Sequence, residues 1–87
     1  MMIPSIHLNG TSQKELLEQV RNAVVSISAS YEILCLATPH GRDYYPQGQE
    51  AYTKANFDHI ERIGKIKAVH DELVKLYFAI EDGGFKR

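Results

Sequence analysis

The spacing of apolar residues in two long segments constrains the fold of this chain more than any other feature. In both segments the apolar side chains recur every three or four positions, which is the repeat of one face of an α-helix. The first series is Leu17, Val20, Val24, Ile27, Tyr31 and Leu34. The second series, apolar except for two histidines, is Tyr52, Ala55, His59, Ile63, Ile66, His70, Leu73, Tyr77 and Ile80. The spacing predicts two amphipathic helices, over residues 11–38 and 49–82.

The residues at the ends of these segments agree with helices. A strand is the alternative for residues 23–28, which are rich in β-branched side chains, but the unbroken three-four spacing over about five turns favours a helix. Ser12 and Glu15 have the spacing of a capping box at the start of the first helix. Pro39 disfavours helical backbone at the residue before it, and Gly83-Gly84 is expected to end the second helix.

The remaining segments are short. Residues 39–48 contain two glycines, a proline, two adjacent tyrosines and an Arg-Asp pair, which indicates a structured loop that folds the helices antiparallel. Residues 1–10 alternate weakly, with Ile6 and Leu8 on one side, and are predicted to form a short extended arm or edge strand. Residues 83–87 form a tail. The expected fold is a single all-α domain, an antiparallel long helical hairpin with an extended N-terminal arm.

The size of the chain and the width of its apolar stripes predict self-association. A chain of 87 residues lies near the size at which one hydrophobic core is only marginally stable. Cys35 is the only cysteine and sits in an apolar run, so we expect it to be buried and no disulfide to add stability. Leu16, Val25 and Ile33 widen the first stripe beyond what one neighbouring helix covers. We therefore expect a homo-oligomeric helical bundle.

Charge and hydropathy disfavour several classes of partner. The net charge is −1, whereas domains that bind long nucleic acids usually carry a basic face. No apolar stretch approaches the roughly 20 residues of a membrane span, and residues 1–5 lack the features of a signal peptide. The expected location is cytoplasmic. On the polar face of the second helix, Asp58 with Arg62 and Lys67 with Asp71 have i,i+4 spacing, as solvated ion pairs do.

The histidines and serines do not form a pattern typical of a metal centre or an active site. His59 and His70 are eleven residues apart, roughly 16 Å along a helix, which is too far to share a metal. His7 and His40 have no partner at ligand spacing, so we expect histidines at the edge of a core, each hydrogen-bonded to a neighbour. The serines of the first helix lack a glycine-flanked nucleophile elbow. No metal, no cofactor and no catalysis are expected.

The loop is the best candidate for binding a ligand. Arg42 offers a planar bidentate donor, Tyr44 and Tyr45 offer stacking faces, and the glycines at either side allow close approach to the backbone. This set suits a small planar anion such as a nucleotide. The alternative is a self-packed loop in which Arg42 pairs with Asp43 or a helix end while the tyrosines cap the hairpin.

A second polar cluster lies at the opposite end of the predicted hairpin. His7, Asn9 and Thr11 precede the first helix, so one protomer does not bring them to the loop. In an antiparallel assembly the loop of one copy approaches the arm of another, with His59 or Arg62 facing the junction. The expected ligand site therefore belongs to the oligomer.

Residues 6–12, IHLNGTS, and 40–48, HGRDYYPQG, carry a resemblance to a known group. Together with an H-x-x-R element at His59 and Arg62, they resemble a group of small uncharacterised proteins of phages and prophages. In architecture the chain is also similar to the nucleotide sponges of the anti-Thoeris and anti-CBASS kind. The resemblance implies a phage anti-defence protein that sequesters a nucleotide-derived immune signal at inter-subunit pockets, without catalysis, in the cytoplasm of the bacterial host.

A second function is open on the same residues. The chain is alternatively a protein-protein interaction module, such as a phage accessory or host-takeover factor, that uses its apolar helix face on a partner. The expected partners are thus copies of the chain itself and a small nucleotide-like ligand, with no long nucleic acid and no membrane.

Overall fold

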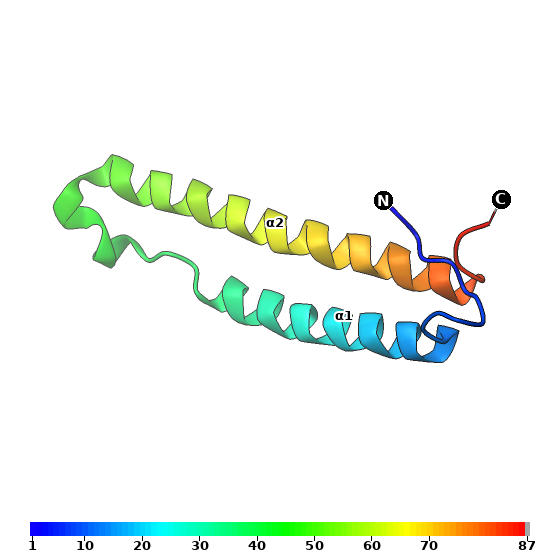
Figure 1. Cartoon of the computed structure of the whole chain (residues 1–87). Helices are drawn as coiled ribbons and strands as arrows, with labels where there is room; N and C mark the ends of the chain where they lie inside the picture. The colour runs from blue at the N-terminus through cyan, green and yellow to red at the C-terminus, as the bar shows by residue number, and fades with distance from the viewer. Residues whose placement is uncertain (87) are drawn as a thin grey trace.

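The chain folds as a long hairpin of two antiparallel helices. A computed structural model describes residues 1–86, with α1 at Gln13–Leu36 and α2 at Gln49–Glu81 lying side by side (Figure 1). Two short 3₁₀ turns, η1 at Gly41–Asp43 and η2 at Tyr45–Gln47, make up half of the connecting loop. The predicted all-α hairpin is confirmed.

Local hydrogen bonds set the ends of α1. The Ser12 hydroxyl accepts a hydrogen bond from the backbone N–H of Glu15 at 3.1 Å, so Ser12 is the N-cap and the helix begins two residues later than residue 11. At the other end the Thr38 hydroxyl donates to the carbonyl of Cys35 at 2.6 Å. This bond satisfies a last-turn carbonyl, and α1 ends at Leu36, two residues before the predicted boundary.

Two hydrogen bonds between a side chain and a backbone carbonyl fix the register of the helices. The Gln13 side-chain amide donates to the carbonyl of Ile80 at 2.9 Å, at the end of α2. His59 Nε2 lies 2.9 Å from the carbonyl of Leu34, in the last turn of α1. The residue numbers add to 93 in both pairs. Residues of α1 and α2 whose numbers add to 93 therefore lie at the same level along the hairpin, and α2 extends beyond α1 toward the loop (Figure 1).

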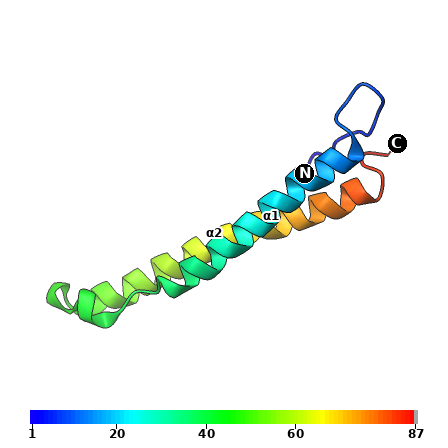
Figure 2. The ribbon, with the colours of Figure 1, turned by 90° about the horizontal axis from the view of Figure 1, so that it is seen from below.

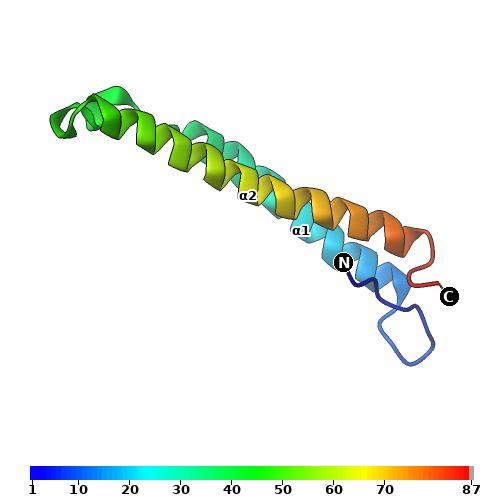
Figure 3. The same ribbon diagram turned by 90° about the horizontal axis from the view of Figure 1, so that it is seen from above.

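The arm packs against the tail of its own chain. The Phe85 N–H donates to the Pro4 carbonyl at 2.8 Å, and Ser5 forms an isolated antiparallel bridge with Gly84. Of the two alternatives predicted for residues 1–10, an extended arm or an edge strand, the edge strand is wrong, since residues 1–86 contain no strand. After this contact the chain makes a turn, in which the Gly10 N–H donates to the His7 carbonyl at 3.1 Å. The loop between this contact and α1 projects from the end of the hairpin in Figures 2 and 3.

The hairpin is thin and buries few side chains. Its extents are 61 × 22 × 17 Å, and its radius of gyration is 18.8 Å, where a compact chain of this length has about 12 Å. Among the described residues only Ile80 and His59 are buried, and Cys35, which was expected to be buried, is half-exposed. The exposed large apolar side chains are Met1, Met2, Leu8, Val25, Ile33, Leu36, Tyr45, Phe57, Ile60, Val69, Phe78 and Phe85.

The charged surface of α2 differs in part from the predicted pairing. Lys67 pairs with Asp71 at 3.2 Å as expected, whereas Asp58 pairs with Lys54 at 3.4 Å rather than with Arg62. Arg62 is instead held by His59, as described below. In the described part of the chain, neither helix has a stretch long and apolar enough to cross a membrane.

Gly84→Ala tests the docking of arm and tail. Gly84 has φ +78°, and an added Cβ would lie 2.6 Å from the Pro4 carbonyl oxygen. We expect the variant to lose at least about 1 kcal/mol of stability, with faster hydrogen exchange at the Phe85 N–H. Gly64→Ala is the matched control, since nothing lies within 4 Å of its added Cβ and the helix should gain about 1 kcal/mol. Unchanged exchange at Phe85 would show that the contact is not formed.

Candidate functional site

The predicted site residues fall into two groups at opposite ends of the hairpin. The group at the loop end is Arg42, Tyr44, Tyr45, His59 and Arg62. The group at the arm end is His7, Asn9 and Thr11. The 24 residues of α1 separate them, and these span about 36 Å. One protomer therefore does not unite the two groups.

At the loop end, the structure brings Tyr44 and Arg62 into one groove of about 240 Å³, the loop-end groove. The groove lies between the loop and the first turns of α2. Its other lining residues are Gln47, Ala51, Lys54, Ala55 and Asp58. Two cationic side chains stand against one carboxylate there. Lys54 pairs with Asp58 at 3.4 Å, and no ion pair within residues 1–86 involves Arg62.

His59 positions Arg62 at this groove. Because a carbonyl oxygen only accepts, the contact with Leu34 requires His59 Nε2 to carry the proton. Nδ1 of the neutral ring is then an acceptor, and it lies 3.4 Å from Arg62 Nη1, which donates. The H-x-x-R element is thus an i,i+3 contact on α2. His59, a predicted ligand-binding residue, is 5% exposed and has a structural role in the hairpin.

The loop separates the three residues that were expected to act together. Arg42 lines neither the loop-end groove nor the second hollow, of about 480 Å³, which Tyr45 lines with Gly41, Gly48, Gln49 and Tyr52. Tyr44 lines the loop-end groove, Tyr45 lines the second hollow and Arg42 lines neither. Within one protomer the three side chains therefore do not line one pocket, and their joint role in a site between subunits stays a prediction.

The self-packed alternative for the loop is correct only in part. The His40 ring, at Nδ1, accepts a hydrogen bond from the Arg42 N–H at 3.1 Å and caps η1. Within residues 1–86 no ion pair joins Arg42 to Asp43. Tyr44 is half-buried, but Tyr45 is 74% exposed and does not cap the hairpin.

The arm-end group lies on the projecting turn. His7, Asn9 and Thr11 are all exposed. The His7 ring packs over Gly10, where an added Cβ would lie 2.8 Å from Nε2. The His7 ring is exposed and lies at the end of a flexible side chain, so it would have to move to admit a larger residue at position 10. The turn presents polar groups on its surface and requires a second surface to enclose a ligand.

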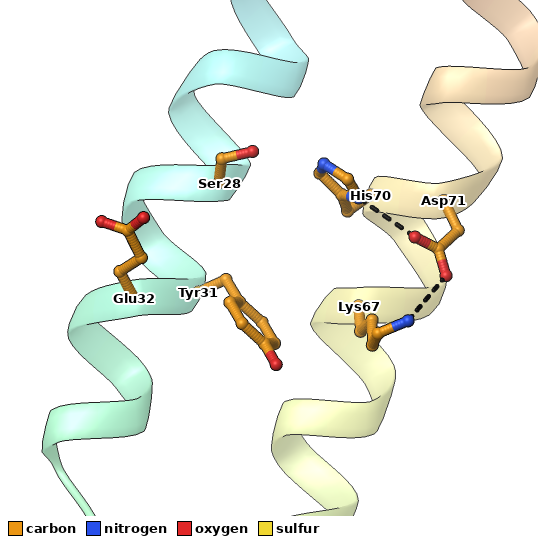
Figure 4. Close-up of a pocket in the computed structure, with 6 residues that line it drawn as sticks. All are labelled: Ser28, Tyr31, Glu32, Lys67, His70 and Asp71. Carbon is orange, nitrogen blue, oxygen red and sulfur yellow. Dashed lines mark hydrogen bonds and ion pairs between the residues drawn. The ribbon is translucent and has the colours of Figure 1, made fainter.

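A further groove, which the sequence did not indicate, lies between the two helices near the middle of the hairpin (Figure 4). This mid-hairpin groove has a volume of about 360 Å³. Its lining residues are Ser28, Tyr31, Glu32, Lys67, His70 and Asp71, three from each helix. The i,i+4 pair of Lys67 and Asp71 was visible in the sequence. The residues across from it were not, because they depend on the register of the helices.

Asp71 is the electrostatic centre of the mid-hairpin groove. Its carboxylate accepts hydrogen bonds from His70 Nδ1 at 3.1 Å and from Lys67 Nζ at 3.2 Å, drawn as dashed lines in Figure 4. The bond from His70, followed by that from Lys67, lowers the pKa of Asp71 from its ordinary value of 3.8. The Asp71 carboxylate is thus the hydrogen-bond acceptor for both His70 and Lys67.

Ser28, His70 and Asp71 are residue types of a catalytic triad, but their arrangement differs from one. No hydrogen bond joins the Ser28 hydroxyl to His70 among the described residues. Ser28 also lies inside α1, where the backbone N–H groups are used within the helix and do not form an oxyanion hole. In residues 1–86 no three His, Cys, Asp or Glu side chains are grouped to hold a metal ion.

The chain was also compared with known proteins. No family model matches it, and neither a curated protein nor a solved structure does. Function is therefore inferred from the residues and surfaces described above.

Asp71→Asn tests the role of the carboxylate. A lowered pKa in the folded chain means that the anion contributes stability above the ordinary carboxyl pKa, and that this contribution is lost as pH falls below about 4. We expect a lower Tm for the variant than for the unaltered chain at about pH 7, with the difference shrinking toward about pH 2. Glu72→Gln is the control, because Glu72 forms no ion pair within residues 1–86. Equal pH dependence of both variants would contradict the assignment.

Proposed function

We propose that the chain is the subunit of a homo-oligomeric helical bundle that holds a small nucleotide-like ligand at inter-subunit pockets, without catalysis. The observation that carries the proposal is the loop-end groove, where Tyr44, Lys54, Asp58 and Arg62 converge. In the setting implied by the resemblance to phage proteins, the ligand is a nucleotide-derived immune signal. Binding in stoichiometric amounts then sequesters it from the host.

The chemistry of the loop-end groove suits such a ligand. The ring of Tyr44 offers a face for stacking on a base, a contact worth about 1–3 kcal/mol. Arg62 and Lys54 offer donors to phosphate oxygens, and Arg62 is pre-oriented by its contact with His59. Asp58 offers an acceptor for a ribose hydroxyl.

The size of the groove supports a site between subunits. Its volume of about 240 Å³ is below the roughly 300–1,000 Å³ of small-molecule sites. A second copy against the groove would supply the missing wall. Arg42 and Tyr45 lie outside the groove on the exposed surface of the loop, where they are free to contact a ligand at a junction.

The exposed area of the hairpin supports self-association. The chain exposes 6864 Å², whereas a compact monomer of 9.9 kDa exposes about 5,200 Å². The excess is about 1,700 Å² per chain, so a pair of chains that buried it would form an interface in the range of obligate homodimers. Twelve large apolar side chains are exposed, and they would supply the apolar part of that interface.

Ligand binding is tested by thermal shift and calorimetry with cyclic dinucleotides and ADP-ribose derivatives. We expect one of them to raise Tm and to bind with fixed stoichiometry, without turnover. Arg62→Ala and Tyr44→Ala should each weaken binding roughly ten- to hundredfold. Lys75→Ala is the control, because it removes the same charge from an exposed position at the far end of α2. No shift with any of these ligands, while the oligomer is intact, would refute the proposal.

The interaction module is the second candidate, and the exposed apolar side chains of both helices favour it. Light scattering distinguishes the two. The homo-oligomer predicts a mass of at least two chains at micromolar concentration. A monomer at that concentration would leave these side chains free for a foreign protein and would remove the inter-subunit site.

A further inference from the structure

One face of α1 is apolar although it points away from α2. The exposed residues Val25, Ala29, Ile33 and Leu36 step by four, four and three positions and form a second stripe, the outward stripe. The large side chains of this stripe are between 61% and 87% exposed. The hairpin alone covers only the inner stripe of α1, which contacts α2.

We infer that the outward stripe is a two-fold interface, on which α1 of a second copy packs antiparallel. The distribution of charge favours this occupant. Between Asn22 and Leu36, α1 carries one charged residue, Glu32, which is exposed at the edge of the outward stripe, three residues after Ala29. The segment of α2 at the same level, Phe57 to Asp71, carries six. Two copies of α1 can thus meet without burying the charged face of either α2.

The position of the outward stripe fits a two-fold contact. Residues of α1 and α2 at the same level along the hairpin have numbers that add to 93. The start of α2 at Gln49 therefore lies where position 44 would be if α1 continued past Leu36. The part of the hairpin that contains helix thus runs from the level of residue 13 to the level of position 44, and its middle is near residue 28. The middle of the outward stripe is near residue 30, about 3 Å away along the axis. A two-fold axis through a central stripe lets two rods overlap along their whole length and bury the largest area. A stripe near one end would give staggered rods.

The side chains of the outward stripe allow close packing. Ala29 lies near the middle and is small, so two helices can approach closely there. Ile33 and Leu36 lie on one side of it and Val25 on the other, so Leu36 of each copy meets the Val25 level of the other. The excess exposed area of about 1,700 Å² per chain is what an obligate dimer of this kind buries.

The antiparallel arrangement also brings the loop of one copy to the arm of the other, and this consequence rests on the proposed function. When the two rods overlap in full, the loop end of one copy lies beside the arm end of the other. The loop residues Arg42 and Tyr45 then come near the polar turn that presents His7, Asn9 and Thr11. Arg62, which is level with position 31 of α1, stays roughly 25 Å along the axis from Gln13 of the other copy.

Single cysteines in a Cys35→Ser background test the interface by oxidative cross-linking. In the antiparallel arrangement Ala29→Cys lies near the axis and should convert most of the chain to a disulfide-linked dimer. Val25→Cys and Leu36→Cys should each remain largely uncross-linked alone, because each lies roughly 16 Å along the axis from its own copy. Mixed and reassembled, these two variants should cross-link to each other. Helix content measured by circular dichroism confirms that each variant is folded.

Other cross-linking patterns would overturn the inference. Cross-linking of all three variants alone would indicate parallel helices. Absence of cross-links in a chain that light scattering shows to be oligomeric would place the interface elsewhere, and a monomer would refute it outright. If the cross-links form as expected but the chain binds none of the nucleotides, the proposed ligand is refuted and the two-fold interface is supported.

Discussion

The structure depends on reciprocal capping between the two helices. The last carbonyls of a helix have no partner within it. Gln13, at the start of α1, donates to the carbonyl of Ile80, and His59 of α2 donates to the carbonyl of Leu34. With so little buried apolar surface, shape complementarity alone would define the register weakly. Two hydrogen bonds placed about 21 residues apart oppose a slip by one turn, since a slip would take the buried His59 ring and the half-buried Gln13 amide away from their acceptors.

The loop-end groove follows from this register. Holding His59 level with Leu34 leaves the first eight residues of α2 beyond the end of α1, and the loop must fold back along them. Tyr44 thereby reaches α2 near Arg62. The same ring that caps α1 turns its other nitrogen to Arg62. One side chain thus couples the stability of the hairpin to the placement of the cationic group at the groove.

The sequence was sufficient for the helices and insufficient for what depends on register. Spacing and end signals predicted α1 and α2 to within two residues, and Ser12 caps α1 as its spacing with Glu15 indicated. The capping by Gln13 and His59 has no local signature, so the mid-hairpin groove was not foreseen. Sequence alone also did not show that Tyr44 and Tyr45 line different hollows and that Arg42 lines neither of them. The arm bridges its own tail through long-range contacts that alternation alone does not specify.

Assembly and ligand binding are expected to be linked in a molecule of this shape. A rod with two buried residues among residues 1–86 has little core of its own, so copies that covered its apolar surface would contribute directly to the folded state. In the proposed assembly, a ligand held between the loop end of one copy and the arm end of another would bind the assembled form and not the separate chains. By mass action it stabilises the assembly in proportion to the logarithm of its concentration. The assembly that would complete the core would therefore also be stabilised by bound ligand, as a protein that sequesters its ligand requires.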